Sequence, residues 1–186
     1  MGAPLTAAGT KAMEIVTVLK LLAQVKIFDG FGPGDLEEFL AQTTGSTYAA
    51  GEQIFAEGEA GRQMHIILSG KVEVYRQSGG KPVSLLRLGP GETFGEMSLV
   101  LDANVGRTAS IRAVAPTATL RLDYESLSHI PGVASQLYRN IARTLATRLR
   151  ISTDLVVFQV QYGGDIPPAA TLGRPRRKPA ARNSGA

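Results

Sequence analysis

Residues 64–76 read MHIILSGKVEVYR, and this stretch decides the fold class. Its first half contains the apolar run His65–Leu68. Its second half, Val72–Arg76, alternates apolar and polar residues with a period of two. That period is typical of a half-buried β-strand, and Gly70 separates the two runs as a turn residue does. The stretch therefore predicts two consecutive short strands.

The same pattern continues on both sides of this stretch. Glycines recur every few residues from Gly51 to Gly106, and Gly79-Gly80 separates two strand-like runs as a hairpin turn does. Several short strands joined by glycine-rich turns are typical of a β-barrel or jelly roll. The further predicted strands are Ser84–Leu88, Thr108–Val114 and Ala118–Leu122.

Helical periodicity flanks the β-region at both ends. Apolar residues at helical spacing predict one helix over residues 11–25, and Pro33 opens a second through Leu40. We therefore expect a mainly β fold with flanking helices: a jelly roll with N-terminal helices and a long C-terminal helix. The expected segments are residues 1–45 (helical), 46–122 (β-roll), 123–160 (C-terminal helices) and 161–186 (disordered basic tail).

The C-terminal region is expected to hold two helices. Asp123 is placed to cap a short helix over Tyr124–His129, and Pro131-Gly132 ends it. A longer helix follows from about residue 133 to residue 160, with apolar residues at every fourth position. Roughly 28 helical residues would extend ~42 Å, which exceeds the expected length of the barrel. The excess length suggests a two-helix homodimer seam, and the alternative is a helix packed within one chain.

Composition excludes several classes of protein. The 186 residues include no cysteine and only two histidines, so we expect no disulfides, no thiol nucleophile and no metal site. The net charge of +4 comes from five basic residues after Asp165, which leaves residues 1–165 at −1. The basic tail is interpreted as solvated, or as a contact for nucleic acid, an anionic membrane or an acidic protein. No secretory signal or membrane span is visible, and we expect a cytoplasmic protein.

Residues 94–99, Phe-Gly-Glu-Met-Ser-Leu, carry the chemistry together with Arg107 and Thr108. Gly95 permits close backbone approach, and a short helix beginning at Glu96 would direct the amides of residues 96–98 outward, where anions bind. Arg107 offers a planar fork that suits phosphate, and the Glu96 carboxylate would accept from a sugar hydroxyl. Phosphate donors beside a ribose acceptor indicate a small nucleotide. The alternative is an ion pair that closes a turn.

Three segments in order resemble the cyclic nucleotide-binding domain of the catabolite activator, of protein kinase A regulatory subunits and of cyclic-nucleotide-gated channels. They are residues 51–59, 64–74 and 88–99, within a resemblance that covers about Leu22 to Leu155. The resemblance implies that Glu96 accepts from the ribose 2′-hydroxyl and that Arg107 pairs with the cyclic phosphate. It also implies a pocket lined by the amides near Gly95, Met97, Ser98, Thr108 and Ala109.

The late helix, residues 145–154, is similar to the long helix of the catabolite activator. This shorter match implies that Arg148 lies near Glu96 and that Ser152 and Thr153 reach the base, one of them from a second subunit as one option. Two departures stand out. Eleven positions separate Glu96 from Arg107, slightly more than is usual in the family, and His65 replaces an aromatic residue. We expect His65 to be a packed strand residue.

These observations predict a non-catalytic receptor for cAMP or cGMP, without a cofactor, that signals by moving its C-terminal helix towards an effector protein. No helix-turn-helix pattern follows Val160, so sequence-specific DNA binding is not expected. Thr108 slightly favours tolerance of cGMP, because its hydroxyl could hydrogen-bond a guanine in the syn orientation. The alternative is a scaffold module of the same fold whose pocket is vestigial or binds a cyclic dinucleotide. An enzyme is the least supported alternative, because no catalytic set of residues is apparent.

Overall fold

The computed structural model describes residues 12–102 and 104–162. They form two compact units, one ending at Leu145 and the other beginning at Ala146, and each is described by itself. The basic tail predicted from residue 161 onward lies almost entirely outside the described residues. None of the described helices is apolar over enough of its length to cross a membrane.

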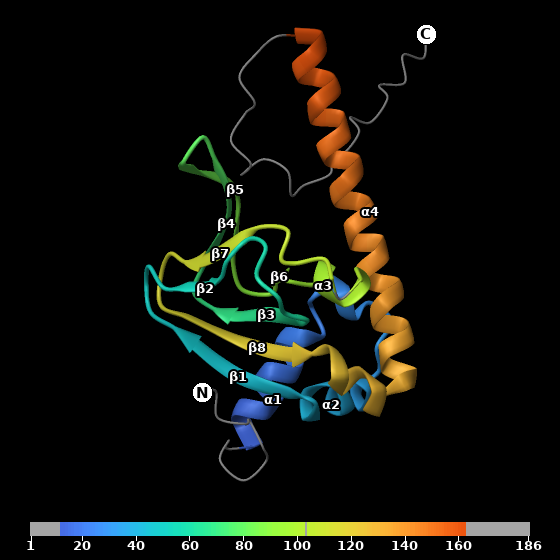
Figure 1. Cartoon of the computed structure of the whole chain (residues 1–186). Helices are drawn as coiled ribbons and strands as arrows, with labels where there is room; N and C mark the ends of the chain where they lie inside the picture. Colours follow the sequence, from blue (N-terminus) through green and yellow to red (C-terminus); the bar gives the residue numbers. More distant parts are fainter. Residues whose placement is uncertain (1–11, 103, 163–186) are drawn as a thin grey trace, which may run out of the picture. The chain divides into compact units, whose positions relative to one another are not determined.

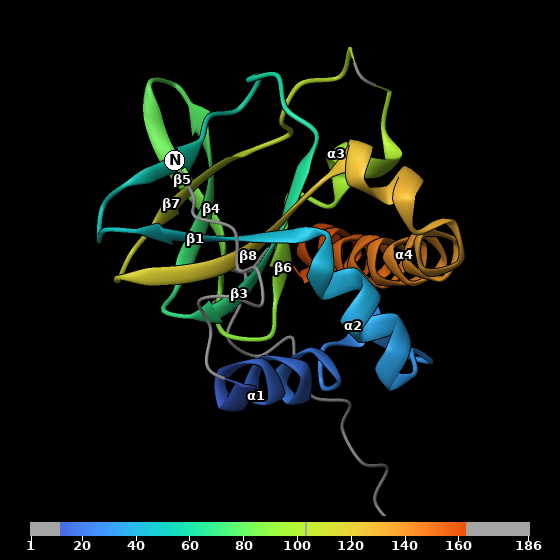
Figure 2. The ribbon, with the colours of Figure 1, turned by 90° about the horizontal axis from the view of Figure 1, so that it is seen from below.

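Two four-stranded antiparallel sheets make up the β-roll (Figures 1 and 2). The strand order is β1-β8-β3-β6 in the first sheet and β2-β7-β4-β5 in the second. The predicted fold class, a jelly roll with flanking helices, is confirmed. The strands are β1 (Thr43–Tyr48), β2 (Gln53–Phe55), β3 (Gln63–Ser69), β4 (Val72–Ser78), β5 (Lys81–Leu88), β6 (Thr93–Phe94), β7 (Ser110–Ala113) and β8 (Thr117–Asp123).

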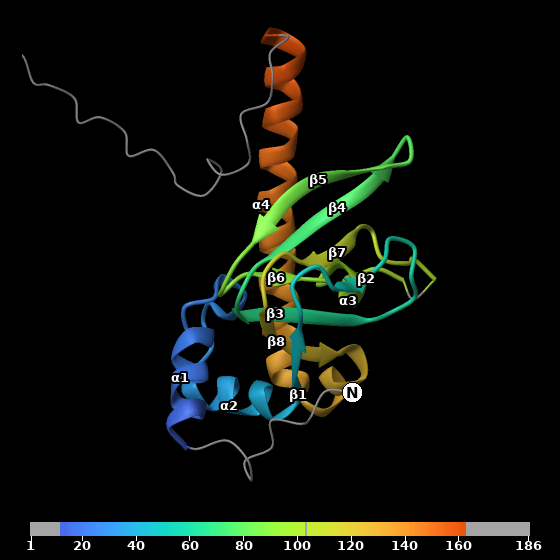
Figure 3. The ribbon, with the colours of Figure 1, turned by 90° about the vertical axis from the view of Figure 1, so that its left-hand side faces the viewer.

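The predicted hairpin at Gly79-Gly80 joins β4 to β5, the long ribbon seen in Figure 3. Both glycines have positive φ, 57° and 76°, as a two-residue hairpin turn of the primed type requires. The strand predicted over Thr108–Val114 is shorter in the structure, because β7 begins at Ser110. Residues 107–109 instead form the loop that carries Arg107.

The helices lie near their predicted positions but with different bounds: the first ends at Leu22 rather than at residue 25, and the last spans Pro131–Tyr162 rather than residues 133–160. Pro131 begins this last helix, where a proline costs no helical hydrogen bond, instead of only ending the preceding one. The helices are α1 (Ala12–Leu22), the 3₁₀ helix η1 (Lys26–Phe28), α2 (Pro33–Ala41), α3 (Met97–Val100), the 3₁₀ helix η2 (Tyr124–His129) and α4 (Pro131–Tyr162). In α2, the Gly32 amide donates to Asp35 Oδ2 at 2.7 Å, which closes the helix start. The predicted cap by Asp123 is wrong in its chemistry: its side chain makes no cap hydrogen bond to η2 and pairs with Arg121 at 3.3 Å.

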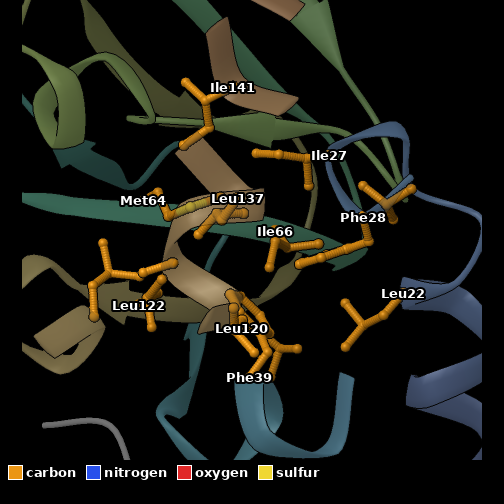
Figure 4. Packing of buried hydrophobic residues seen from close by; sticks show 14 of the residues in the cluster. Leu22, Ile27, Phe28, Phe39, Met64, Ile66, Leu120, Leu122, Leu137 and Ile141 are labelled. Carbon is orange, nitrogen blue, oxygen red and sulfur yellow. The ribbon is translucent and has the colours of Figure 1, made fainter. Parts of the chain in front are cut away.

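Alternation along β3 sends its side chains into two separate cores. Met64 and Ile66 face the helices, in a cluster with Phe28 and Phe39 from the N-terminal helices and with residues of β8 and α4 (Figure 4). Leu137 and Ile141, spaced four apart on α4, are fully buried in this cluster. The part of α4 before Ala146 is therefore a packed helix of the first unit.

The second core lies between the two sheets. It consists of Phe55, Ile67, Val72, Leu88, Phe94 and Ile111. His65 lies on the same side of β3 as Ile67, and its ring stacks on Phe94 with centroids 4.8 Å apart. The expectation that His65 is a packed strand residue is confirmed, since it is 3% exposed and forms a hydrogen bond with Thr119 Oγ1.

Candidate functional site

The motif of residues 94–99 forms a sharp corner between β6 and α3. Phe94 is buried in the core between the sheets and Leu99 in the core against the helices, so the chain must turn between them. Gly95 makes the turn with φ +76°. A Cβ at this position would lie 2.6 Å from the main-chain oxygen of Gln63, a contact too short for any side chain. Only glycine fits here.

Arg107 is brought to this corner by a second loop. Its amide donates to Glu59 O at 2.9 Å, and its carbonyl accepts from Gly58 N at 2.8 Å. The neighbouring Gly106 allows the close approach, because a Cβ there would lie 2.5 Å from Gly58 O. The Arg107 side chain consequently points into the roll and is only 5% exposed.

Neutral oxygens hold the Arg107 guanidinium. Nη1 donates to Gln63 O at 2.7 Å and to Ser98 Oγ at 2.9 Å, and Nη2 donates to Gln63 Oε1 at 2.7 Å. The guanidinium carbon also lies 4.1 Å from the centre of the Phe55 ring, within the range of a cation–π contact. These contacts use three of the five N–H donors of an arginine side chain.

The positive charge of Arg107 has no close counter-charge in the described part of the chain. No described carboxylate lies within the 4.0 Å of an ion pair, and Nε has no described hydrogen-bond acceptor. Burial lowers the pKa of Arg107, and only the longer-range charge of Glu59 opposes this shift. Burying a charge without a partner is costly, so such a residue is a candidate for binding an anion.

Glu96 and Ser98 occupy the same corner. Glu96 precedes α3 and is 2% exposed. The Ser98 hydroxyl donates to Gly95 O at 2.8 Å while it accepts from Arg107, which ties the two loops together. The amide of Ser98 donates to Gly95 O at 3.2 Å, so in this structure it serves the turn.

The remaining predicted residues of the first unit lie on its surface. Met97 is 37% exposed, and its sulfur accepts a hydrogen bond from Thr108 Oγ1 at 3.5 Å. Thr108 is exposed and Ala109 is half-buried. The structure thus brings Gly95, Ser98 and Arg107 into direct contact and links Met97 with Thr108. Their role in ligand binding stays a prediction.

The three candidate residues on α4 belong to the second unit. Arg148 is half-buried, while Ser152 and Thr153 are exposed. The Thr153 hydroxyl donates to Leu149 O within the same helix. Because each unit is described by itself, the predicted approach of these residues to Glu96 and to a base stays a prediction.

The sequence analysis did not predict the residues that contact the guanidinium but lie far from Arg107 along the chain. Gln63 and Phe55 lie 44 and 52 positions before Arg107, and neither carries a motif of its own. Gly61 is the third missed residue: a Cβ there would lie 3.0 Å from Arg107 Nη2. The cluster of glycines around residues 58–61 was the one available signal of close packing.

A buried arginine without a close described counter-charge, at a glycine corner of a β-roll, is a candidate anion site. Comparison with known proteins identifies the family. Residues 46–130 match the family model of the cyclic nucleotide-binding domain, and the chain belongs to this family.

Two curated relatives and one solved structure agree with this assignment. The "Cyclic AMP receptor protein" of Thermus thermophilus is 38% identical over 141 residues, which cover 72% of this chain and 62% of that protein. The "CRP-like cAMP-activated global transcriptional regulator" of Mycobacterium tuberculosis is 31% identical over 146 residues, which cover 76% of this chain and 64% of that protein. The crystal structure of the Thermus thermophilus catabolite activator protein superposes with a TM-score of 0.66 at 36% identity, covering 73% and 63%. The chain thus spans less than two thirds of the length of these relatives.

Proposed function

We propose that this chain is a non-catalytic receptor for a cyclic mononucleotide, cAMP or cGMP. The observation that carries the proposal is the buried guanidinium of Arg107, which is 5% exposed and is held by neutral oxygens. A phosphodiester carries one negative charge and two oxygens that can each accept a hydrogen bond. It would supply both the charge and the acceptors that the described residues do not offer Arg107.

Glu96 supports the same ligand from the sugar side. It lies one residue beyond Gly95 and directly before α3, whose Ser98 contacts Arg107. In this proposal its carboxylate accepts from the ribose 2′-hydroxyl, while the amides near Gly95, Met97, Thr108 and Ala109 line the pocket. The Ser98 amide joins them only if its bond to Gly95 O opens, whereas the Ser98 hydroxyl already positions Arg107.

In this proposal, α4 contacts the nucleotide base and transmits the signal. Arg148 would approach Glu96, and Ser152 and Thr153 would reach the base. A ligand that contacts α4 only in one placement of that helix would shift the population towards that placement, because the binding free energy differs between the two. An effector protein would read the change. A second copy of this chain would pair with the first through the exposed apolar residues Leu149, Val156 and Val157 of α4.

Isothermal titration calorimetry with cAMP, cGMP, a cyclic dinucleotide and AMP tests the proposal. We expect one cyclic mononucleotide to bind. Each charge-assisted hydrogen bond contributes about 1.5–3 kcal/mol. Arg107→Ala should therefore weaken binding at least tenfold, or about 1.4 kcal/mol. The control is Arg139→Ala, which removes an exposed arginine of the same unit.

The alternatives give different results in the same titration. A scaffold module with a vestigial pocket would bind none of the four ligands, and a cyclic dinucleotide receptor would bind only that one. Unchanged affinity in Arg107→Ala would refute the site even if a cyclic mononucleotide binds. Release of AMP from cAMP by the purified protein would contradict the assignment as a receptor without catalysis.

A further inference from the structure

A single uncharged residue accepts two of the three described hydrogen bonds of the Arg107 side chain. The main-chain oxygen of Gln63 accepts from Nη1, and its side-chain Oε1 accepts from Nη2, each at 2.7 Å. Gln63 is the first residue of β3, so its backbone is fixed by pairing with Asp123 of β8. The sheet thus fixes the main-chain oxygen, and the side-chain Oε1 of the same residue adds the second acceptor.

The neutrality of this residue has a physical consequence. A glutamine amide and a glutamate carboxylate have nearly the same shape, but only the carboxylate would neutralise a guanidinium at 2.7 Å. With glutamine at position 63, the described residues around Arg107 hold it without cancelling its charge. Glu59 acts on it only at longer range. The buried charge is therefore left without a close counter-charge among the described residues.

The donors that Gln63 leaves unused suit an anion. Three side-chain N–H groups of Arg107 are engaged by described residues, which leaves Nε–H and one hydrogen of Nη2. These lie on adjacent nitrogens, the pair that binds two oxygens of one phosphate. Gly61 lies close against this edge, because a Cβ there would lie 3.3 Å from Nε and 3.0 Å from Nη2, and Nε itself is buried.

We propose that Gln63 determines the anion affinity of Arg107. It is a positioning residue that fixes the guanidinium while leaving its positive charge and two of its donors for the ligand's phosphate. The inference rests on the proposed function and deepens it, because it makes ligand affinity depend on the charge at position 63, outside the motif that contains Glu96 and Arg107.

Three variants separate charge from shape. Gln63→Glu places a carboxylate against Arg107, and we expect cyclic nucleotide affinity at least tenfold below that of the wild type. Gln63→Met removes the side-chain hydrogen bond without adding charge, and we expect a smaller loss, because Nη1 keeps both of its acceptors. Gln24→Glu makes the same change in net charge at an exposed position and should bind like the wild type.

Thermal melting without ligand provides a readout that a merely structural role would not give. The new ion pair with the buried guanidinium should leave the Tm of Gln63→Glu equal to or above that of the wild type, so weak binding cannot be attributed to unfolding. A lowered Tm would overturn the inference. So would binding by Gln63→Glu within twofold of the wild type, or a loss in Gln63→Met as large as that in Gln63→Glu.

Failure of the proposed function gives a different result. If the wild type binds no cyclic nucleotide, inorganic phosphate becomes the probe, in melts compared with chloride at equal ionic strength. The inference then predicts that phosphate raises the Tm of the wild type and of Gln24→Glu but not of Gln63→Glu. An absent phosphate effect in the wild type would refute it.

Discussion

Replacing Gly95 by alanine tests the geometry of the corner independently of any ligand. Two costs add at this position. A side chain at φ +76° is strained by about 1–2 kcal/mol in the left-handed region. Its Cβ would also lie 2.6 Å from Gln63 O and 3.1 Å from Arg107 Nη1, so the two loops would have to move apart. Overpacking of this kind typically costs about 1–3 kcal/mol.

We therefore expect Gly95→Ala to lower the free energy of unfolding by about 2–5 kcal/mol, the sum of the two costs. For a chain of this size each kcal/mol lowers the Tm by about 2–4 °C, so the Tm should fall by at least about 4 °C. Urea denaturation followed by circular dichroism measures the free energy, and a thermal scan measures the Tm.

Gly51→Ala is the matched control. Gly51 has a similar φ of +85°, but a Cβ there would meet nothing within 4 Å. Gly51→Ala should therefore be destabilised only by the backbone strain, by about 1–2 kcal/mol. Gly95→Ala should also bind cyclic nucleotide at least tenfold more weakly, because Gln63 O is an acceptor of Arg107. Equal destabilisation in the two variants would refute the close approach at the corner.

Burial lowers the pKa of His65 from 6.5 to about 3, with smaller contributions from Arg107 and Arg121. As the pH falls, the unfolded chain takes up a proton on this histidine near pH 6.5, whereas the folded chain does not. The free energy of unfolding should therefore fall by up to about 1.4 kcal/mol for each pH unit between 6.5 and 3. Urea titrations at pH 7, 6 and 5 should show a shallower pH dependence of this free energy in His65→Phe than in the wild type, and an equally steep one would contradict the role of His65. Glu73→Gln removes a buried carboxylate whose Oε2 accepts from an arginine of β7 at 2.8 Å, so unfolding should become easier by about 1–3 kcal/mol while nucleotide affinity in calorimetry stays unchanged. Light scattering should detect a dimer of the wild type and a monomer of Val156→Glu, since that change puts a charge on an exposed apolar position of α4; a wild-type monomer would rule out the dimer.

Local chemistry accounts for the parts of the fold that the sequence predicted. Alternation along Val72–Arg76 and the glycine pair at residues 79–80 are strand and turn signals that hold without knowledge of neighbours. The strand β1 was not predicted as such, because its sequence, TTGSTY, shows no apolar alternation. Its place is decided by pairing with β8 across six residues.

The candidate site also contains residues that local sequence predicts and residues that it does not. The motif predicts Gly95, Glu96, Ser98 and Arg107, because a glycine corner, a carboxylate and a guanidinium suit a sugar phosphate whatever surrounds them. Only the folded chain placed Gln63 against Arg107, since the two residues are 44 positions apart and meet through sheet pairing.

Residue types and local spacing are enough to predict the short strands, the glycine turns, and one cation and one carboxylate near the same corner. The tertiary structure decided that the Arg107 charge is buried among neutral oxygens and left without a close described counter-charge. Burial and charge compensation depend on residues from several strands at once, so no local pattern could encode them.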